Sequence, residues 1–249
     1  MTTEITSRQN SEIKRIASLK DKKYRKKYGE YLVEGIKEVS EAILSGQNIS
    51  AVIGLKEVLL SLPDCDAKLI ETNDKIIEFI SDTVTPQGVF AVVKVPENTA
   101  ESPKSNCAVL DGVKDPGNVG TIIRTCAALG IRDLFLCDCA DPYSPKAVRS
   151  SMSGIYSVRI FECEREEVYS LLCGKNKILV ADMGGEKIFT AYITEPYAIV
   201  VGNEANGVSD FFKERADKTI AIPMENNVES LNAAVAFSVT AYTLYGKKF

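Results

Sequence analysis

The sequence of 249 residues contains no histidine. A chain without histidine cannot build the Ser-His or Cys-His pairs of nucleophilic enzymes, and it lacks the side chain that most often acts as a general base. Its seven cysteines are odd in number and scattered, and none forms a Cys-x-x-Cys pair. This composition argues against a zinc site, so we expect no metal. We interpret the cysteines as small buried hydrophobic residues in a reducing compartment.

Long apolar runs are also missing. No stretch approaches the roughly 20 apolar residues that a membrane span needs, and the chain is polar from Thr2 onward, unlike a secretory signal. With 45% hydrophobic and 26% charged residues the composition is that of a globular protein rather than a disordered one. We therefore predict a cytoplasmic protein that does not associate with a membrane.

The net charge of −4 does not by itself suggest nucleic acid, but its distribution does. Residues 14–27 contain eight basic side chains and one acidic side chain. A local basic segment is an electrostatic signature of phosphate binding, although a solvated helix face would look the same. Tyr24, Tyr28 and Tyr31 lie in or near the segment and could stack on unpaired bases, or belong to a core. The predicted RNA-binding residues are Lys14, Arg15, Lys22, Lys23, Arg25, Lys26 and Lys27.

The chain divides at a polar, proline-containing stretch. Residues 1–95 read as a small α/β unit, with helical spacing at 11–19, 36–44 and 75–80 and short strands at 31–33, 51–54 and 89–95. Residues 96–106 (PENTAESPKSN) show no apolar pattern and indicate a linker.

Residues 107–249 alternate strands with helices. Strands are predicted at 108–110, 133–137, 178–181 and 198–201, and helices at 120–129 and 231–245. The short, almost wholly apolar runs are typical of strands buried on both faces of a parallel sheet. The prediction is an α/β domain with a mostly parallel sheet.

Three polar loops follow predicted strands: DPGNVG at 115–120 with Arg124 beyond it, GNEANG at 202–207, and IPMENNVESLN at 222–232. Each alone could be an ordinary turn. Ligands of open α/β sheets bind beyond the carboxyl ends of the strands, so three such loops together favour one binding site. None is a dinucleotide or Walker motif. The segment 182–185 (DMGG) resembles half of a nucleotide loop, but it is more typical of a turn after a strand.

The segments LDGVKDPGNVGTIIRT, VVGNEANGVS and IPMENNVESLNAAVA resemble, in order and spacing, the three motifs of the SpoU/TrmH family of RNA 2′-O-ribose methyltransferases. The resemblance covers residues 107–249, and the segment before them is similar to the family's ribosomal-protein-like RNA-binding domain. It implies a SPOUT-type α/β fold with a C-terminal trefoil knot, a homodimer with its active site near the interface, and S-adenosylmethionine as cofactor. The knot could not be derived from periodicity, since knots are nearly absent from proteins.

The resemblance also implies roles for particular residues. Asn118, Arg124, Glu204, Ser230 and Asn232 match the family's active-site positions. Gly202, Ile222 and Leu231, together with Val201 and Met224 from the same motifs, are the predicted cofactor-binding residues.

Arg124 is proposed in the family to assist deprotonation of the ribose hydroxyl. Because a guanidinium stays protonated, we instead expect Arg124 to bind phosphate and stabilise developing alkoxide charge. Glu204 would orient Arg124 or Asn118, or form a salt bridge that only shapes the dimer. The RNA is expected to be ribosomal; a tRNA methyltransferase and a catalytically silent RNA-binding or assembly factor are alternatives. An oxidoreductase is disfavoured because the dinucleotide motif is missing.

Overall fold

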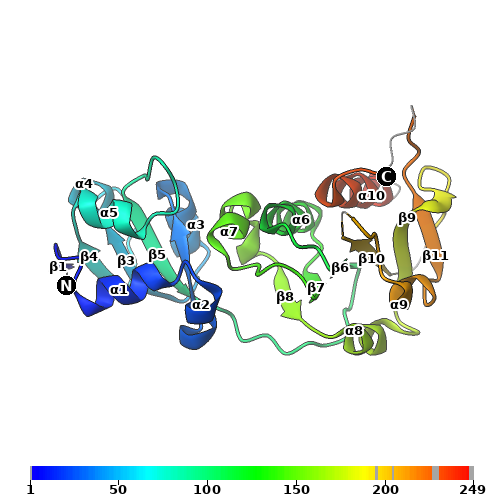
Figure 1. Cartoon of the computed structure of the whole chain (residues 1–249), viewed down its shortest axis with the longest axis horizontal. Coiled ribbons are helices and arrows are strands. Elements are labelled where there is room, and N and C mark those ends of the chain that lie inside the picture. The colour runs from blue at the N-terminus through cyan, green and yellow to red at the C-terminus, as the bar shows by residue number, and fades with distance from the viewer. Residues whose placement is uncertain (1, 194–195, 204, 226–229, 247–249) are drawn as a thin grey trace. The chain divides into compact units, whose positions relative to one another are not determined.

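The computed structural model describes residues 2–193, 196–203, 205–225 and 230–246 (Figure 1). The chain forms two compact units that divide between Glu97 and Asn98. The segment Tyr143–Tyr156 belongs to the first unit, although it lies within the second half of the sequence. The predicted division, with residues 107–249 as one domain, does not account for this segment, which the chain contributes to the first unit.

The first unit is a five-stranded mixed sheet with helices against it. Its strand order is β1-β4-β3-β5-β2, in which β1, β4 and β3 are parallel and β5 is antiparallel to both neighbours. The elements are β1 (Thr2–Glu4), α1 (Ser11–Ser18), α2 (Lys22–Tyr28), β2 (Glu30–Glu34), α3 (Ile36–Leu44), β3 (Ile49–Gly54), α4 (Lys56–Leu59), β4 (Lys68–Glu71), α5 (Asp74–Ile80), β5 (Val89–Lys94), α7 (Pro145–Ser151) and the 3₁₀ turn η1 (Gly154–Tyr156).

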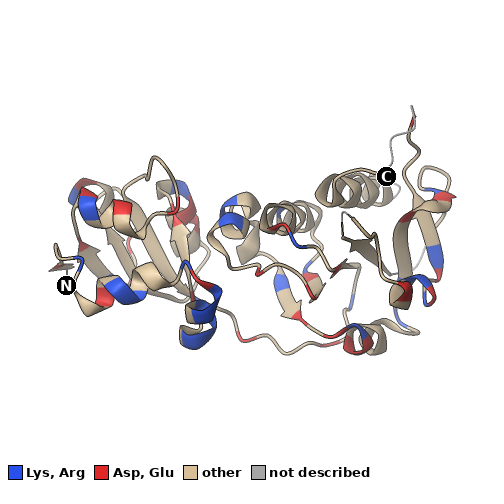
Figure 2. Cartoon of the chain, in the orientation of Figure 1, with Lys and Arg blue, Asp and Glu red and all other residues tan. Residues whose placement is uncertain are grey.

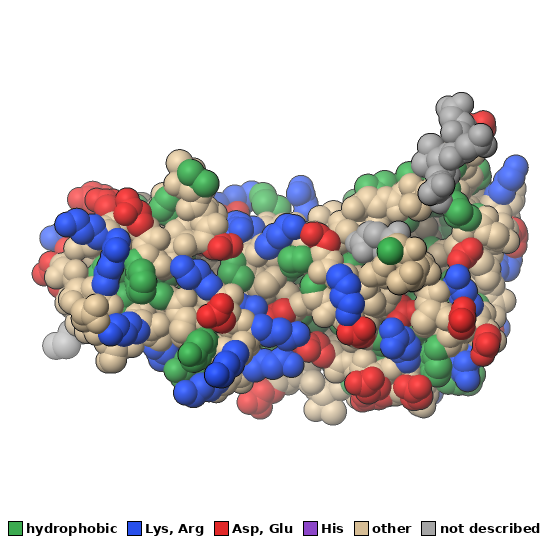
Figure 3. All heavy atoms as spheres, in the orientation of Figure 1, with side chains coloured by type: hydrophobic (Ala, Val, Ile, Leu, Met, Phe, Trp, Pro, Cys, Tyr) green, Lys and Arg blue, Asp and Glu red, His purple; other side chains and the backbone are tan. Residues whose placement is uncertain are grey.

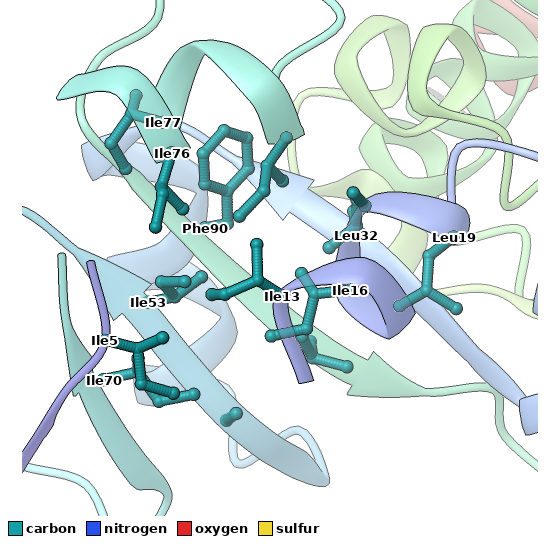
Figure 4. Packing of buried hydrophobic residues seen from close by; sticks show 14 residues of the cluster. Ile5, Ile13, Ile16, Leu19, Leu32, Ile53, Ile70, Ile76, Ile77 and Phe90 are labelled. Atoms are coloured by element: carbon teal, nitrogen blue, oxygen red, sulfur yellow. The ribbon is translucent and has the colours of Figure 1, made fainter. Parts of the chain in front are cut away.

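The core of this unit lies between the sheet and the helices α1 and α5. Ile13 and Ile16 share one face of α1 because helix neighbours recur every three to four residues, and both are fully buried. Figure 4 shows them pointing at Ile53, with Ile76 of α5 and Phe90 of β5 in the same cluster. The apolar spacing seen in the sequence is thus what docks the helices on the sheet.

The second unit is a six-stranded sheet in which every described strand pair is parallel, in the order β11-β9-β10-β6-β7-β8. β6 and β7 are buried along their whole length, as the apolar runs predicted. The elements are β6 (Cys107–Asp111), α6 (Pro116–Leu129), β7 (Asp133–Cys137), β8 (Arg159–Glu162), α8 (Arg165–Leu172), β9 (Lys177–Lys187), β10 (Tyr197–Gly202), α9 (Asp210–Lys213), β11 (Lys218–Ala221) and α10 (Ala233–Gly246).

Helices cover both faces of this sheet. α6 and α10 lie side by side on one face, joined by a hydrogen bond of 2.8 Å between the hydroxyls of Thr125 and Ser238 (Figure 1). Val168 of α8 and Phe212 of α9 pack in the core of the other face. This arrangement confirms the predicted α/β fold with a parallel sheet.

The stretch predicted as a linker, 96–106, contains no helix or strand, but its side chains contact the second unit. Glu101 pairs with Arg159 at 2.5 Å, and Ser102 accepts a hydrogen bond of 2.6 Å from Lys175. Residues 98–106 therefore lie along the second unit. None of the helices within the described ranges combines the length and apolar character that a membrane span requires.

Candidate active site

The strand order reverses between β6 and β10. From β6 the chain proceeds outward through β7 and β8, then crosses to β9 and returns to β10 beside β6. Such a switch point, at the carboxyl ends of the strands, is where open α/β sheets bind ligands. The first motif follows β6 and the second follows β10, so the fold brings them to adjacent positions at this edge.

A pocket of 530 Å³ lies at this edge, formed by the ends of β10 and β11, by β9 and by the start of α10. All five predicted cofactor-binding residues line it, and Ser230 of the third motif lines it too: Val201, Gly202, Ile222, Met224, Ser230 and Leu231. Its volume is within the range of about 300–1,000 Å³ of small-molecule sites. The walls are mostly apolar side chains and backbone, with a few polar groups.

The second motif forms a closed turn. Asn203 and Gly207 exchange two backbone hydrogen bonds, of 3.0 and 2.8 Å, and the Asn203 side-chain oxygen accepts from the amides of Ala205 and Asn206. A Cβ atom on Gly202 would lie only 2.1 Å from the carbonyl carbon of Gly207. Glycine is required at 202 because two backbone segments meet there, rather than to leave room for a ligand.

Two amide side chains join the first and third motifs. The Nδ2 of Asn232 donates to the Oδ1 of Asn118 at 2.9 Å. Asn118 occupies the first turn of α6, which begins at Pro116 rather than at the predicted 120, and Asp115 caps that helix by accepting from the Asn118 amide at 3.0 Å. Asn232 lies between Leu231 and Ala233, which both line the pocket. Asn232 is therefore at the rim of the pocket, with Asn118 bonded to it, although neither side chain is part of the lining.

Arg124 is a predicted active-site residue that lies away from the pocket lining. It is exposed on α6, six residues after Asn118, about 9 Å further along the helix axis. Its side chain does not line the pocket. Glu204 lies outside the described residues.

Asp182 is a pocket residue that the sequence reasoning did not assign. The register between β9 and β11 jumps from Val180 to Glu186, and within the intervening bulge Asp182 and Met183 line the pocket. The DMGG segment is thus a bulge in a strand and part of the pocket wall. The Lys213 ammonium, 2.9 Å from the Asp182 carboxylate, holds the pKa of that carboxyl below its usual value, and the Gly184 amide adds to the effect.

The basic segment of the first unit is the helix α2 and the end of α1. Figure 2 shows Lys and Arg gathered on α2, and in Figure 3 basic side chains there surround hydrophobic ones. The rings of Tyr24 and Tyr28 stack with centroids 6.2 Å apart, and Lys23 and Lys27 lie over them at 5.8 and 5.2 Å. Lys14, Lys22, Lys23, Lys26 and Lys27 are all exposed.

One predicted RNA contact needs correction, and of the two alternatives left open for Tyr31 the core position is the one observed. Arg25 is only 5% exposed, and its Nη1 donates to the carbonyls of Leu19 and Lys20 at 2.7 and 2.6 Å, so it holds α2 against the end of α1. Tyr31 is 1% exposed and packs on Tyr143 with ring centroids 5.0 Å apart, so it belongs to the core. Arg15 is half-buried and pairs with Glu30.

Among the described residues, no group of three or more cysteine, aspartate or glutamate side chains lies close enough together to hold a metal ion. All seven cysteines are free. Burial raises the pKa of the Cys139 thiol to about 11, which leaves it protonated at neutral pH and a poor nucleophile.

Comparison with known proteins gives two family matches. The model of the SpoU rRNA Methylase family matches residues 105–242, and that of the MRM3-like substrate binding domain matches residues 10–91. Together they span both structural units.

Individual proteins match over nearly the whole chain. An uncharacterized tRNA/rRNA methyltransferase of Synechocystis is 30% identical over 96% of this chain and 92% of its own. The 23S rRNA (guanosine(2553)-2′-O)-methyltransferase RlmP of Bacillus subtilis is 29% identical over 98% of this chain and 99% of its own. The crystal structure of an AdoMet-bound rRNA methyltransferase from Sinorhizobium meliloti superimposes with a TM-score of 0.90, at 25% identity, covering 100% of this chain and 99% of that one.

Proposed function

Because the chain belongs to the SpoU rRNA methylase family, we propose that it transfers a methyl group from S-adenosylmethionine (AdoMet) to a ribose 2′-hydroxyl of ribosomal RNA. The observation that carries this proposal is the pocket that the second and third motifs form together. Val201 and Gly202 of the second motif and Ile222, Met224 and Leu231 of the third line the same space, and Asn118 of the first motif is hydrogen-bonded to Asn232 of the third.

The pocket residues fit AdoMet. The aliphatic side chains of Val201, Ile222 and Leu231 offer apolar walls for a flat base. The carboxylate of Asp182 and the hydroxyl of Ser230 offer partners for the ribose or the amino group. Backbone groups of the lining residues at the ends of β10 and β11 add to this donor and acceptor set. Bound there, AdoMet supplies the electrophilic methyl group.

The chain's own residues position the acceptor. The hydrogen bond between Asn118 and Asn232 fixes both amides at the rim, where their remaining donors and acceptors are suited to a ribose hydroxyl. A guanidinium has donors but no acceptor for a proton, so we do not assign Arg124 the role of a base. We assign it the adjacent phosphate and the negative charge that develops on the ribose oxygen.

A second copy of the chain would complete this site. α10 contains no charged residue from Ala233 to Gly246, and a helix apolar on all sides is normally buried. Yet Val235 and Tyr242 are 47% and 53% exposed in the single chain. The same helix lines the pocket with Ala233 and Ala236 near its start. An exposed apolar face so close to the pocket supports a homodimer in which Arg124 acts across the interface. Equilibrium sedimentation at twice the chain mass supports the proposal; a monomer at micromolar concentration contradicts it.

The substrate proposal rests on the first unit. Its match to the MRM3-like substrate binding domain and the exposed lysines of α2 support RNA binding there. The relatives that carry a substrate in their names include 23S rRNA enzymes, which favours ribosomal RNA over tRNA. A cytoplasmic location and a trefoil knot remain part of the proposal; free cysteines are in keeping with the first.

The experiment is methylation of total RNA with labelled AdoMet, followed by alkaline hydrolysis. A 2′-O-methylated ribose resists cleavage of its phosphodiester, so the label is expected in an alkali-stable dinucleotide derived from rRNA. Asn118→Ala and Arg124→Ala are expected to lower the rate about 100-fold or more, while Lys56→Ala, on the short helix α4 of the first unit, leaves it unchanged. Label in tRNA would move the substrate assignment, and label on a base would refute the ribose assignment.

A further inference from the structure

A buried carboxylate at the end of β6 has no part in the chemistry assigned above. Asp111 is 2% exposed and pairs with Gly202 in the sheet register. Its Oδ1 accepts a hydrogen bond of 2.7 Å from the Nε of Arg165, and its Oδ2 accepts one of 2.7 Å from the backbone amide of Ser209. Both carboxylate oxygens are therefore committed to fixed partners from other elements.

The neighbouring residue holds the other end of the same loop. The carbonyl of Gly112 accepts from the Asn203 side-chain amide at 2.9 Å. Gly112 has a φ of +78°, a left-handed conformation that favours glycine, and its own amide donates to Cys137 at 2.8 Å. The loop between Asn203 and Ser209 is thus fastened at its first residue to Gly112 and at its last to Asp111.

Between these two anchors the loop has its own internal bonds. The exchange of hydrogen bonds between Asn203 and Gly207 links the two sides of the turn to each other. Asn203, Ala205 and Gly207 all line the pocket. The position of this wall of the pocket is therefore set by two anchors, Asp111 at the end of β6 and Gly112 directly after it.

Core packing alone would not call for a carboxylate at this position. A buried ion pair is often no more stable than apolar residues of similar size, because both charges lose their hydration. A leucine at 111 could fill the core, but it could not accept from the Ser209 amide or hold Arg165. The carboxylate instead makes directional hydrogen bonds, which connect the start of α8 and the start of α9 to the end of β6.

We propose that Asp111, oriented by Arg165, is a positioning residue that fixes Asn203 and residues 205–209 against the methyl-donor pocket. The inference rests on the proposed function for what the pocket holds. The inference goes beyond the proposed function because it makes the affinity for AdoMet depend on Asp111 and Arg165, which do not line the pocket.

The test compares Asp111→Asn with a matched control in the same sheet. Asp133 is 3% exposed and accepts from the Nε of Arg159 at the same 2.7 Å, but it lies at the amino end of β7, away from the pocket. Asp111→Asn turns one acceptor into a donor, so we expect KM for AdoMet to rise about tenfold, with KM for RNA unchanged. Asp133→Asn is expected to lower stability while leaving KM for AdoMet as in the wild type.

A second substitution supplies a rescue. In Asp111→Asn with Arg165→Gln, the glutamine oxygen accepts from the new amide, and the asparagine oxygen stays with Ser209. We expect KM for AdoMet to return to within about threefold of the wild type, since one lost bond is replaced. If Asp111→Asn does not fold, Arg165→Gln alone is the test and is expected to raise KM for AdoMet.

Hydrogen exchange at the amides of residues 205–209 gives a readout that does not need activity. Faster exchange there in Asp111→Asn, and not in Asp133→Asn, supports the positioning role. Equal effects of the two variants on exchange and on KM for AdoMet would overturn it. A wild-type protein that binds no AdoMet in calorimetry would instead refute the proposed function, and exchange would still decide the role of Asp111.

Discussion

Replacing Gly202 by alanine tests the close backbone approach at the centre of the site. The new Cβ would lie 2.1 Å from the carbonyl carbon and oxygen of Gly207 and 2.2 Å from the amide nitrogen of Val208. Carbon atoms attract at about 3.5 Å or more, so the turn after β10 must move by about an ångström. β10 cannot yield instead, because Gly202 is paired with Asp111 of β6.

The magnitude follows from this displacement. Overpacking against backbone costs about 1–3 kcal/mol, which for a protein of this size lowers Tm by about 2–12 °C. A shift of about 1 Å in a positioning element can lower a reaction rate about 100-fold. We therefore expect Gly202→Ala to lose stability moderately and methyl transfer severely.

The matched control is Gly184→Ala, since a Cβ there would lie 3.8 Å from the Asp182 carboxylate, an ordinary contact. That variant should stay within about 0.5 kcal/mol of the wild type. Differential scanning calorimetry gives Tm, and titration calorimetry gives the affinity for AdoMet. A Gly202→Ala protein that matches Gly184→Ala in both measurements would refute the explanation of Gly202.

Other predictions concern charge. Replacing Lys23, Lys26 and Lys27 by Ala should reduce the slope of log affinity for single-stranded RNA against log salt by about 2, measured by fluorescence anisotropy; an unchanged slope would exclude α2 from the RNA contacts. Arg25→Met should leave that slope unchanged but cost about 1–3 kcal/mol of unfolding free energy, because two carbonyls lose their donor. Asp182→Asn should cost about 0–1 kcal/mol at pH 7. Because the folded pKa of Asp182 is lowered, that difference is present above the unfolded pKa near 3.9 and disappears as pH falls through the folded value; denaturant titrations over this range check it, and a difference that grows in acid would be the wrong sign.

The sequence predicted what depends on local pattern. The apolar runs at 133–137 and 198–201 are strands at β7 and β10, and the spacing of Ile13 and Ile16 is a helix face. α2 was missed as a separate helix because KKYRKKY has no apolar side, and its stability comes from the buried guanidinium of Arg25. Composition alone cannot distinguish such a residue from the exposed lysines around it.

In the pocket, too, residues within the motifs were predicted and residues that act through long-range contacts were not. Motif order identified Val201, Gly202 and Leu231, since the resemblance concerns residues close together in sequence. Asp182 and Asp111 act through contacts with Lys213 and Arg165, which are far away in sequence. The grouping of Tyr143–Tyr156 with the first unit is likewise a contact between distant segments. Periodicity carries no information about such contacts.

The most direct test of the account is where AdoMet protects the backbone. Hydrogen exchange of the purified protein, with and without AdoMet, should slow at residues 181–183, 201–203, 205–207, 220–224 and 230–236, the segments that supply the walls of the pocket, and should not change in β1 to β5. Protection in the first unit, or none in these segments at saturating AdoMet, would contradict the claim that the second and third motifs form the methyl-donor site.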